Sequence, residues 1–110
     1  MPTASKSSTT TRKEDLLPLI TPGEILREEF LNPLHLTPNA LSLALRVPAN
    51  RILAIVSGQR AITTDTALRL GRYFGNSPEF WLNLEQNYQL NRAKREKADK
   101  ISRDVTPRAA

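Results

Sequence analysis

The chain has 110 residues, enough for one small domain, and its 39% hydrophobic content allows a modest core. It has no cysteine, which excludes a disulfide framework and a thiolate metal site. The first fifteen residues hold no apolar run that could serve as a signal peptide, and no stretch is long enough to span a membrane. We therefore expect a cytoplasmic protein with no membrane partner.

The net charge of +5 suggests a polyanionic partner, but the charge is unevenly distributed. Residues 1–15 carry three cations and two anions, residues 16–91 carry six of each, and residues 92–110 carry seven cations and three anions. The central region is neutral. Any case for nucleic-acid binding must therefore come from where its individual arginines point.

The predicted elements begin after residues 1–15, whose small and polar side chains cannot bury enough surface to order them, so we interpret them as a flexible arm. Prolines favour the first position of a helix, where their missing N–H would be unpaired in any case. Helices are accordingly expected to open at Pro22, Pro38, Pro48 and Pro78.

Five short helices follow from these signals and from their caps. Thr21 and Thr37 can cap the first two, over 22–31 and within 38–47. The third covers 48–57 and ends at Gly58, the fourth lies within 63–75, and the fifth begins after a serine cap and covers 78–90. No strand pattern competes with them. The predicted fold is all-α, with 16–91 as one domain.

Residues 92–110 form a charged segment with oppositely charged side chains four residues apart, as in Glu96 and Lys100. Such pairs could continue the fifth helix. Because the apolar content is too thin to pack, we favour a frayed, solvated helix or a tail.

The second and third helices are joined by only a few residues around Arg46, which predicts a helix-turn-helix. In that motif the first turn of the second helix faces base edges in the DNA major groove. Asn pairs with adenine, Arg with guanine, and Ala meets a thymine methyl group. The candidate base-reading residues are Ala49, Asn50, Arg51 and Ala54. An ordinary solvated helix face remains the alternative.

Two further groups are candidates for phosphate contacts, which supply affinity rather than sequence choice. Thr37 and Asn39 lie at the amino end of the second helix, where free N–H groups attract anions. Gln59, Arg60 and Thr63 lie in the loop just beyond the third helix.

The fifth helix offers Trp81, Leu84 and Tyr88 on one face as candidate dimer contacts. The alternative is that they close the core, which we favour for Trp81. The single histidine, His35, has no second histidine or cysteine nearby, so neither a metal site nor a Ser-His-acid set is expected. The sequence predicts no cofactor and no enzyme activity.

The segments "TPGEILREEFL", "LTPNALSLAL", "VPANRILAIVSGQRAITTDTALRLGRYFG" and "SPEFWLNLEQNYQL" resemble the HigA-type antitoxins, a branch of the Xre (phage repressor-like) helix-turn-helix family. The resemblance covers residues 19–90. It implies a five-helix, lambda-repressor-like domain that binds operator DNA as a homodimer and represses its own operon. It also implies a toxin partner, a small RelE-like mRNA-cleaving protein that the antitoxin neutralises. A free-standing Xre repressor without a toxin, or a module that binds only protein, would share the same helical region.

Three positions depart from the family pattern. Arg46 stands where the turn between the second and third helices commonly has glycine, so we expect a slightly reshaped turn. Ser42 replaces a common alanine but is small enough to keep close helix packing, and Leu43 occupies an often polar position.

Overall fold

The computed structural model describes residues 17–109, which contain only helices and the segments that connect them. In chain order these are α1 (Pro22–Ile25), the π-helical η3 (Leu26–Leu31), α2 (Pro38–Leu45), α3 (Ala49–Val56), α4 (Thr64–Phe74) and α5 (Pro78–Asp104). The all-α prediction is confirmed. The predicted flexible arm lies outside the described residues.

Side-chain caps set the starts of four helices. A side-chain oxygen of the cap accepts the backbone N–H three residues on in each case: Thr21 from Glu24, Thr37 from Ala40, Thr63 from Thr66, and Ser77 from Phe80. The third helix differs. Pro48 has an extended backbone and precedes the helix as its cap, so α3 begins one residue later than predicted.

The first predicted helix is a single α-helical turn that continues as the π-helix η3. Leu26 and Leu31 are both buried although they are five residues apart, a spacing that does not share one face of an α-helix. A π-helix joins residues i and i+5, and the backbone N–H of Asn32 donates to Arg27 at 2.9 Å in that pattern. The wider coil therefore turns both leucines toward the core.

The core is formed by buried aliphatic side chains from η3, α2, α3 and α4, by Ile62 of the α3–α4 loop and by one tryptophan of α5. Trp81 is fully buried, its indole N–H donates to the Asn76 side chain at 2.9 Å, and its ring lies 4.8 Å from that of Phe30. Because a side chain without exposed surface cannot touch a second protomer, Trp81 is a core residue and not a dimer contact.

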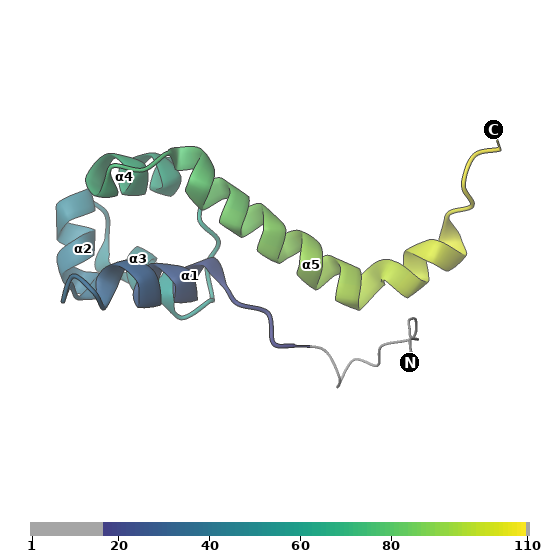
Figure 1. Ribbon diagram of the computed structural model, residues 1–110, viewed down its shortest axis with the longest axis horizontal. Coiled ribbons are helices and arrows are strands. Elements are labelled where there is room, and N and C mark those ends of the chain that lie inside the picture. Colours follow the sequence, from purple (N-terminus) through teal and green to yellow (C-terminus); the bar gives the residue numbers. More distant parts are fainter. Residues whose placement is uncertain (1–16, 110) are drawn as a thin grey trace, which may run out of the picture.

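The helices α1 and α3 pack almost backbone to backbone (Figure 1). A Cβ atom at Gly23 would lie 1.7 Å from the carbonyl oxygen of Ile55, so only glycine fits there. This contact fixes the depth at which α3 sits against the rest of the domain.

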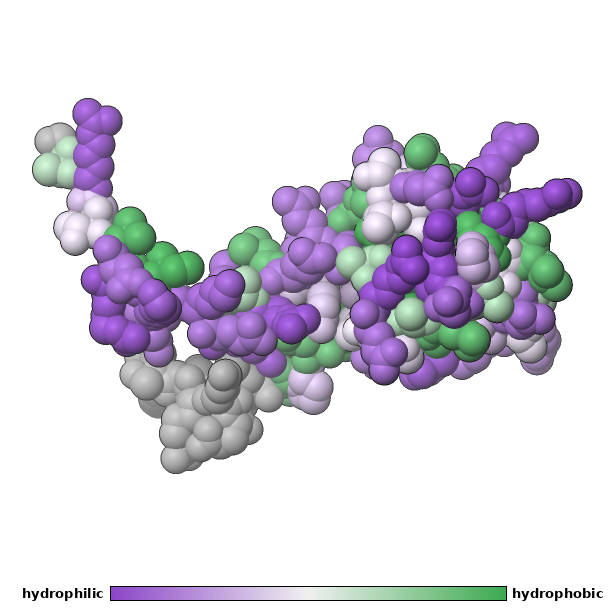
Figure 2. Space-filling view, turned by 180° about the vertical axis from the view of Figure 1, so that it is seen from behind, coloured by the Kyte–Doolittle hydropathy of each residue, from purple (hydrophilic) through white to green (hydrophobic). Residues whose placement is uncertain are grey.

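The fifth helix continues well past the predicted 78–90 and ends at Asp104, so the charged segment is helical in its first thirteen residues. Figure 1 shows this part of α5 leaving the other helices, and Figure 2 shows it as a mostly hydrophilic projection. Its pairs at i, i+4 include Arg92 with Glu96, at 3.2 Å.

Candidate nucleic-acid interface

The turn between α2 and α3 contains three residues, and its first is left-handed. Arg46 has φ 61° and ψ 46°, and its N–H donates to Leu43 while the N–H of Val47 donates to Ser42. The turn is therefore not reshaped as expected: arginine adopts the conformation that glycine normally supplies, at a cost of about 1 kcal/mol.

The other two departures from the family pattern fit the structure as anticipated. Ser42 is buried, and its hydroxyl donates to the carbonyl oxygen of Asn39 at 2.6 Å, which leaves the close packing of α2 intact. Leu43 is 71% exposed, an apolar side chain on the open face of α2.

The helix α3 is held by Ile52 and Ile55, both fully buried, and presents its opposite face to solvent. Asn50 is exposed there, and the two predicted alanines, Ala49 and Ala54, are half-buried. This orientation leaves an amide and small side chains accessible in the first turns of α3.

Leu53 also lies on this open face, 52% exposed, and sequence reasoning missed it. The spacing i, i+3, i+4, i+7 from Asn50 runs through Leu53, Ala54 and Ser57, so helical periodicity alone could have placed Leu53 there.

Arg51 differs from its prediction as an outward-pointing reader. Its side chain is only 23% exposed, and its terminal nitrogen donates to a carboxylate oxygen of Asp65 at 2.9 Å. The buried Nε has no hydrogen-bond partner among the described residues. One terminal nitrogen of the guanidinium is thus engaged with the start of α4.

Asp65 is the centre of a small ionic cluster. It also accepts from Arg69 at 3.0 Å, and Arg69 in turn donates to the carbonyl oxygen of Leu45, the last residue of α2, at 2.9 Å. The hydrogen bonds from Arg69 and Arg51 hold the pKa of Asp65 below its ordinary value. The cluster joins the end of α2 to the starts of α3 and α4.

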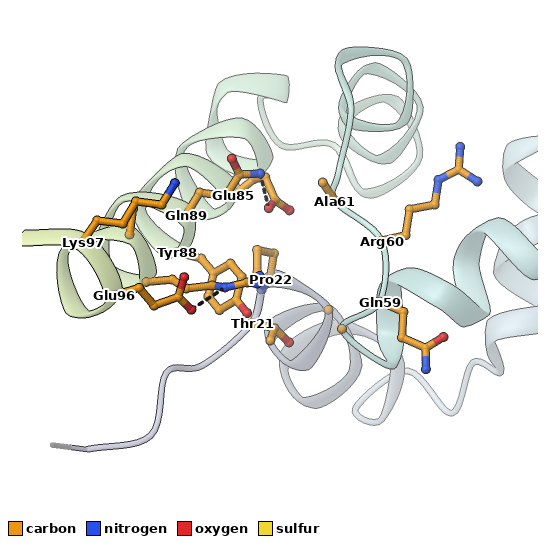
Figure 3. Close-up of a pocket in the computed structure, with 14 residues that line it drawn as sticks. Thr21, Pro22, Gln59, Arg60, Ala61, Glu85, Tyr88, Gln89, Glu96 and Lys97 are labelled. Carbon is orange, nitrogen blue, oxygen red and sulfur yellow. Dashed lines mark hydrogen bonds and ion pairs between the residues drawn. The ribbon is translucent and has the colours of Figure 1, made fainter. Parts of the chain in front are cut away.

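The predicted phosphate-contact residues Thr37, Asn39, Gln59, Arg60 and Thr63 are all exposed. The two threonines cap α2 and α4, and the backbone N–H groups of those first turns supply the positive end of each helix. Arg60 forms no ion pair with any residue in 17–109. Figure 3 shows the Gln59 and Arg60 side chains pointing away from α5.

The loop between α3 and α4 is held in place by a buried carboxylate, that of Glu85. In the sequence, Glu85 could be recognised only as one negative charge among several. Glu85 is 8% exposed and accepts the backbone N–H of Ile62 at 2.8 Å with one oxygen. Its other oxygen accepts the Gln89 amide at 2.8 Å (Figure 3). Gly58, with φ 81°, ends α3 in the left-handed conformation as predicted. The loop that carries Arg60 is therefore anchored at both ends.

The remaining predicted dimer contacts are only partly covered. Leu84 is half-buried and packs on the core, and Tyr88 is half-buried one turn further along α5. Both line a mostly apolar groove with residues 17–20, in which Leu17 is 79% and Ile20 61% exposed.

Residues 17–109 contain no group of three or more histidine, cysteine, aspartate or glutamate side chains arranged to hold a metal ion. Within the same range, no helix combines the length and the apolar character needed to cross a bilayer.

Comparison with known proteins places these features in a family, although no protein-family model matches the chain. The chain is 53% identical over 81 residues to virulence-associated protein I of Dichelobacter nodosus, covering 74% of this chain and 75% of that protein. The solved structure of the Pseudomonas aeruginosa antitoxin HigA with the higBA promoter has a TM-score of 0.81 and 43% identity, over 84% of this chain and 100% of that chain. A HigA-family addiction module antidote protein from Coxiella burnetii has a TM-score of 0.79 and 46% identity, over 84% and 100%. These antitoxins are not enzymes, as the sequence predicted for this chain. The chain belongs to the HigA family of helix-turn-helix antitoxins.

Proposed function

We propose that this chain is an antitoxin that binds its own operator DNA as a homodimer, represses its operon and neutralises a small RelE-like toxin. The observation that carries the proposal is the open face of α3, with Asn50 accessible in the first turn and the candidate phosphate-contact residues exposed on either side. The solved complex of the related Pseudomonas aeruginosa antitoxin with promoter DNA supports it.

On DNA, α3 enters the major groove and Asn50 forms two hydrogen bonds with an adenine edge. Ala49 and Ala54 allow the helix to approach closely. The start of α2, at Thr37 and Asn39, contacts one stretch of backbone. Gln59, Arg60 and Thr63 contact the other. Two protomers place their α3 helices in half-sites about 34 Å apart, or a multiple of that distance.

In this arrangement Arg51 has a different part from the one predicted by sequence alone. Its ion pair with Asp65 orients the first turn of α3 against α4. Replacing Arg51 by alanine is therefore expected to weaken DNA binding, because the first turn of α3 is no longer held against α4. Any contact between the exposed part of Arg51 and a phosphate is lost as well.

The DNA part of the proposal is tested by fluorescence anisotropy with the chain's own promoter DNA over a salt series. Asn50→Ala is expected to cost about 1–3 kcal/mol at the cognate site and to relax base preference. Arg60→Ala is expected to weaken all sequences alike and to reduce the salt slope by about one. Arg27→Ala, which removes the same charge from the exposed side of η3, is the control. If Arg27→Ala and Arg60→Ala have equal effects, binding follows net charge and not this surface.

The homodimer is proposed to form through the groove that Leu84 and Tyr88 line beside residues 17–20. Tyr88→Glu and Ile20→Glu are expected to give monomers by light scattering, while Leu43→Glu on α2 stays dimeric. If only Leu43→Glu disrupts the dimer, the interface is instead formed by the exposed apolar side chains of α2 and α4.

The toxin part is tested by expressing the operon with a tag on the antitoxin alone. We expect a small protein to co-purify and to cleave mRNA only after the antitoxin is removed. If the chain shifts its promoter but no protein co-purifies, it is a free-standing repressor.

A further inference from the structure

One feature of α3 has no part in the proposed adenine contact: its open face carries a single large apolar side chain. Leu53 is 52% exposed, although a leucine gains free energy from burial and this helix buries Ile52 and Ile55 beside it. The backbone of α3 turns Leu53 outward because it shares the face of Asn50 and Ser57, not that of the isoleucines.

The neighbours of Leu53 argue against a protein-docking patch. On the same face it is flanked by Asn50, Ala54 and Ser57, which are polar or small. Docking surfaces are broad apolar patches, whereas on this face of α3 one large apolar side chain has only polar or small neighbours. Its size instead matches a single small apolar group on the partner.

The DNA major groove offers one apolar group that distinguishes bases, the methyl group of thymine. Leu53 lies one turn after Asn50, and Ala54 adds a second apolar side chain beside it. The guanine-reading group that α3 could have offered, the guanidinium of Arg51, is bound to Asp65 at 2.9 Å. The open face of α3 therefore offers an amide for adenine and apolar carbon for thymine.

We infer that Leu53 is a specificity-determining residue that contacts a thymine methyl group, an inference that rests on the proposed function. The operator bases under the first two turns of α3 are then A·T pairs. The inference concerns which bases are read. Operator binding itself depends on Asn50 and the phosphate contacts.

The test removes one methyl group at a time from the DNA. Each thymine of the operator half-site is replaced by deoxyuridine, which keeps every hydrogen-bonding group, and affinity is measured by anisotropy. The native chain is expected to lose affinity about fourfold at one or two positions, the size of burying one methyl group. Leu53→Ala is expected to bind thymine DNA more weakly by a similar factor and to ignore deoxyuridine at that position.

Two variants serve as controls. Leu43→Ala removes an equally large exposed leucine from α2 and is expected to keep the full response to deoxyuridine. Asn50→Ala is expected to bind weakly but still to respond to the methyl group. Unchanged thermal melting of Leu53→Ala excludes a folding defect.

The outcomes separate the two proposals. A chain that does not bind its promoter contradicts the proposed function. A chain that binds it but is indifferent to deoxyuridine overturns the inference about Leu53, as does a Leu53→Ala variant that keeps the native response at every position.

Discussion

The buried carboxylate of Glu85 gives the sharpest test of how the α3–α4 loop is held. Glu85→Ala removes the acceptor of the Ile62 backbone N–H, and Ile62 is 3% exposed, so a donor in a buried position loses its partner. Glu85→Gln keeps an oxygen that can accept the same N–H and removes only the charge. The two variants therefore separate the loss of a hydrogen bond from the loss of a carboxylate.

The expected magnitudes differ accordingly. A hydrogen bond to a charged group contributes about 1.5–3 kcal/mol, and a stranded buried donor costs about 1–3 kcal/mol. Glu85→Ala should lower the free energy of unfolding by about 2–3 kcal/mol, and Glu85→Gln by about 1 kcal/mol. For a domain of this size, 2 kcal/mol corresponds to a fall in Tm of about 10 °C.

The assay is urea unfolding followed by the fluorescence of Trp81, the only tryptophan and fully buried. Gln86→Ala, an exposed substitution next to Glu85 on α5, should change stability by less than about 0.5 kcal/mol. If Glu85→Ala and Glu85→Gln were equally stable, the Ile62 N–H would not depend on this acceptor and the reasoning would be wrong.

Three other predictions concern the contacts that hold the helix-turn-helix together. Arg46→Gly should raise the free energy of unfolding by about 0.5 kcal/mol in urea titrations, because it relieves a left-handed arginine while adding flexibility to the unfolded chain; a loss of stability would contradict this account. Gly23→Ala should cost about 3 kcal/mol or more, since its Cβ would lie 1.7 Å from a backbone oxygen of α3; a thermal melt like that of the native chain would show that the two helices are not in contact. Asp65 has a lowered pKa because Arg69 and Arg51 donate to it, so its contribution to stability is present above its ordinary pKa of 3.8 and is lost as the pH falls through the lowered folded value; Asp65→Asn should abolish that part of the acid dependence.

Local signals in the sequence were sufficient to predict most of the fold. The caps Thr21, Thr37 and Ser77 each form the expected hydrogen bond, and Gly58 and Gly75 end their helices in the left-handed conformation. These predictions succeed because a cap or a stop depends on residues three or four apart.

The features of the fold that the sequence did not predict depend on competing packing requirements or on contacts between residues far apart in the chain. The π-helix arises because Leu26 and Leu31 must both reach the core, which a rule for regular helices does not anticipate. The extension of α5 was predicted to fray for want of apolar contacts, whereas its i, i+4 ion pairs lie along a continuous helix.

The candidate site shows the same division. The open face of α3 follows from periodicity, although applying it strictly would have included Leu53. The state of Arg51 could not be predicted in this way, because its partner Asp65 is fourteen residues away on another helix. Glu85 is harder still, since its bond to Ile62 spans twenty-three residues and involves a backbone group that no side-chain pattern reveals.

The neutral balance of residues 16–91 is consistent with DNA binding because the charges are sorted by position. Arg51 and Arg69 are both paired with Asp65, where they join α2, α3 and α4. Arg60 is exposed beside α3, and the first turns of α2 and α4 add the positive ends of two helices without any formal charge. The surface next to α3 is thus more positive than a count of side chains suggests, while two of the acidic side chains, Asp65 and Glu85, are engaged in contacts within the domain. In the proposed complex, affinity depends on the geometry of a few groups, so the anchored loop and the fixed turn contribute to DNA binding by positioning those groups.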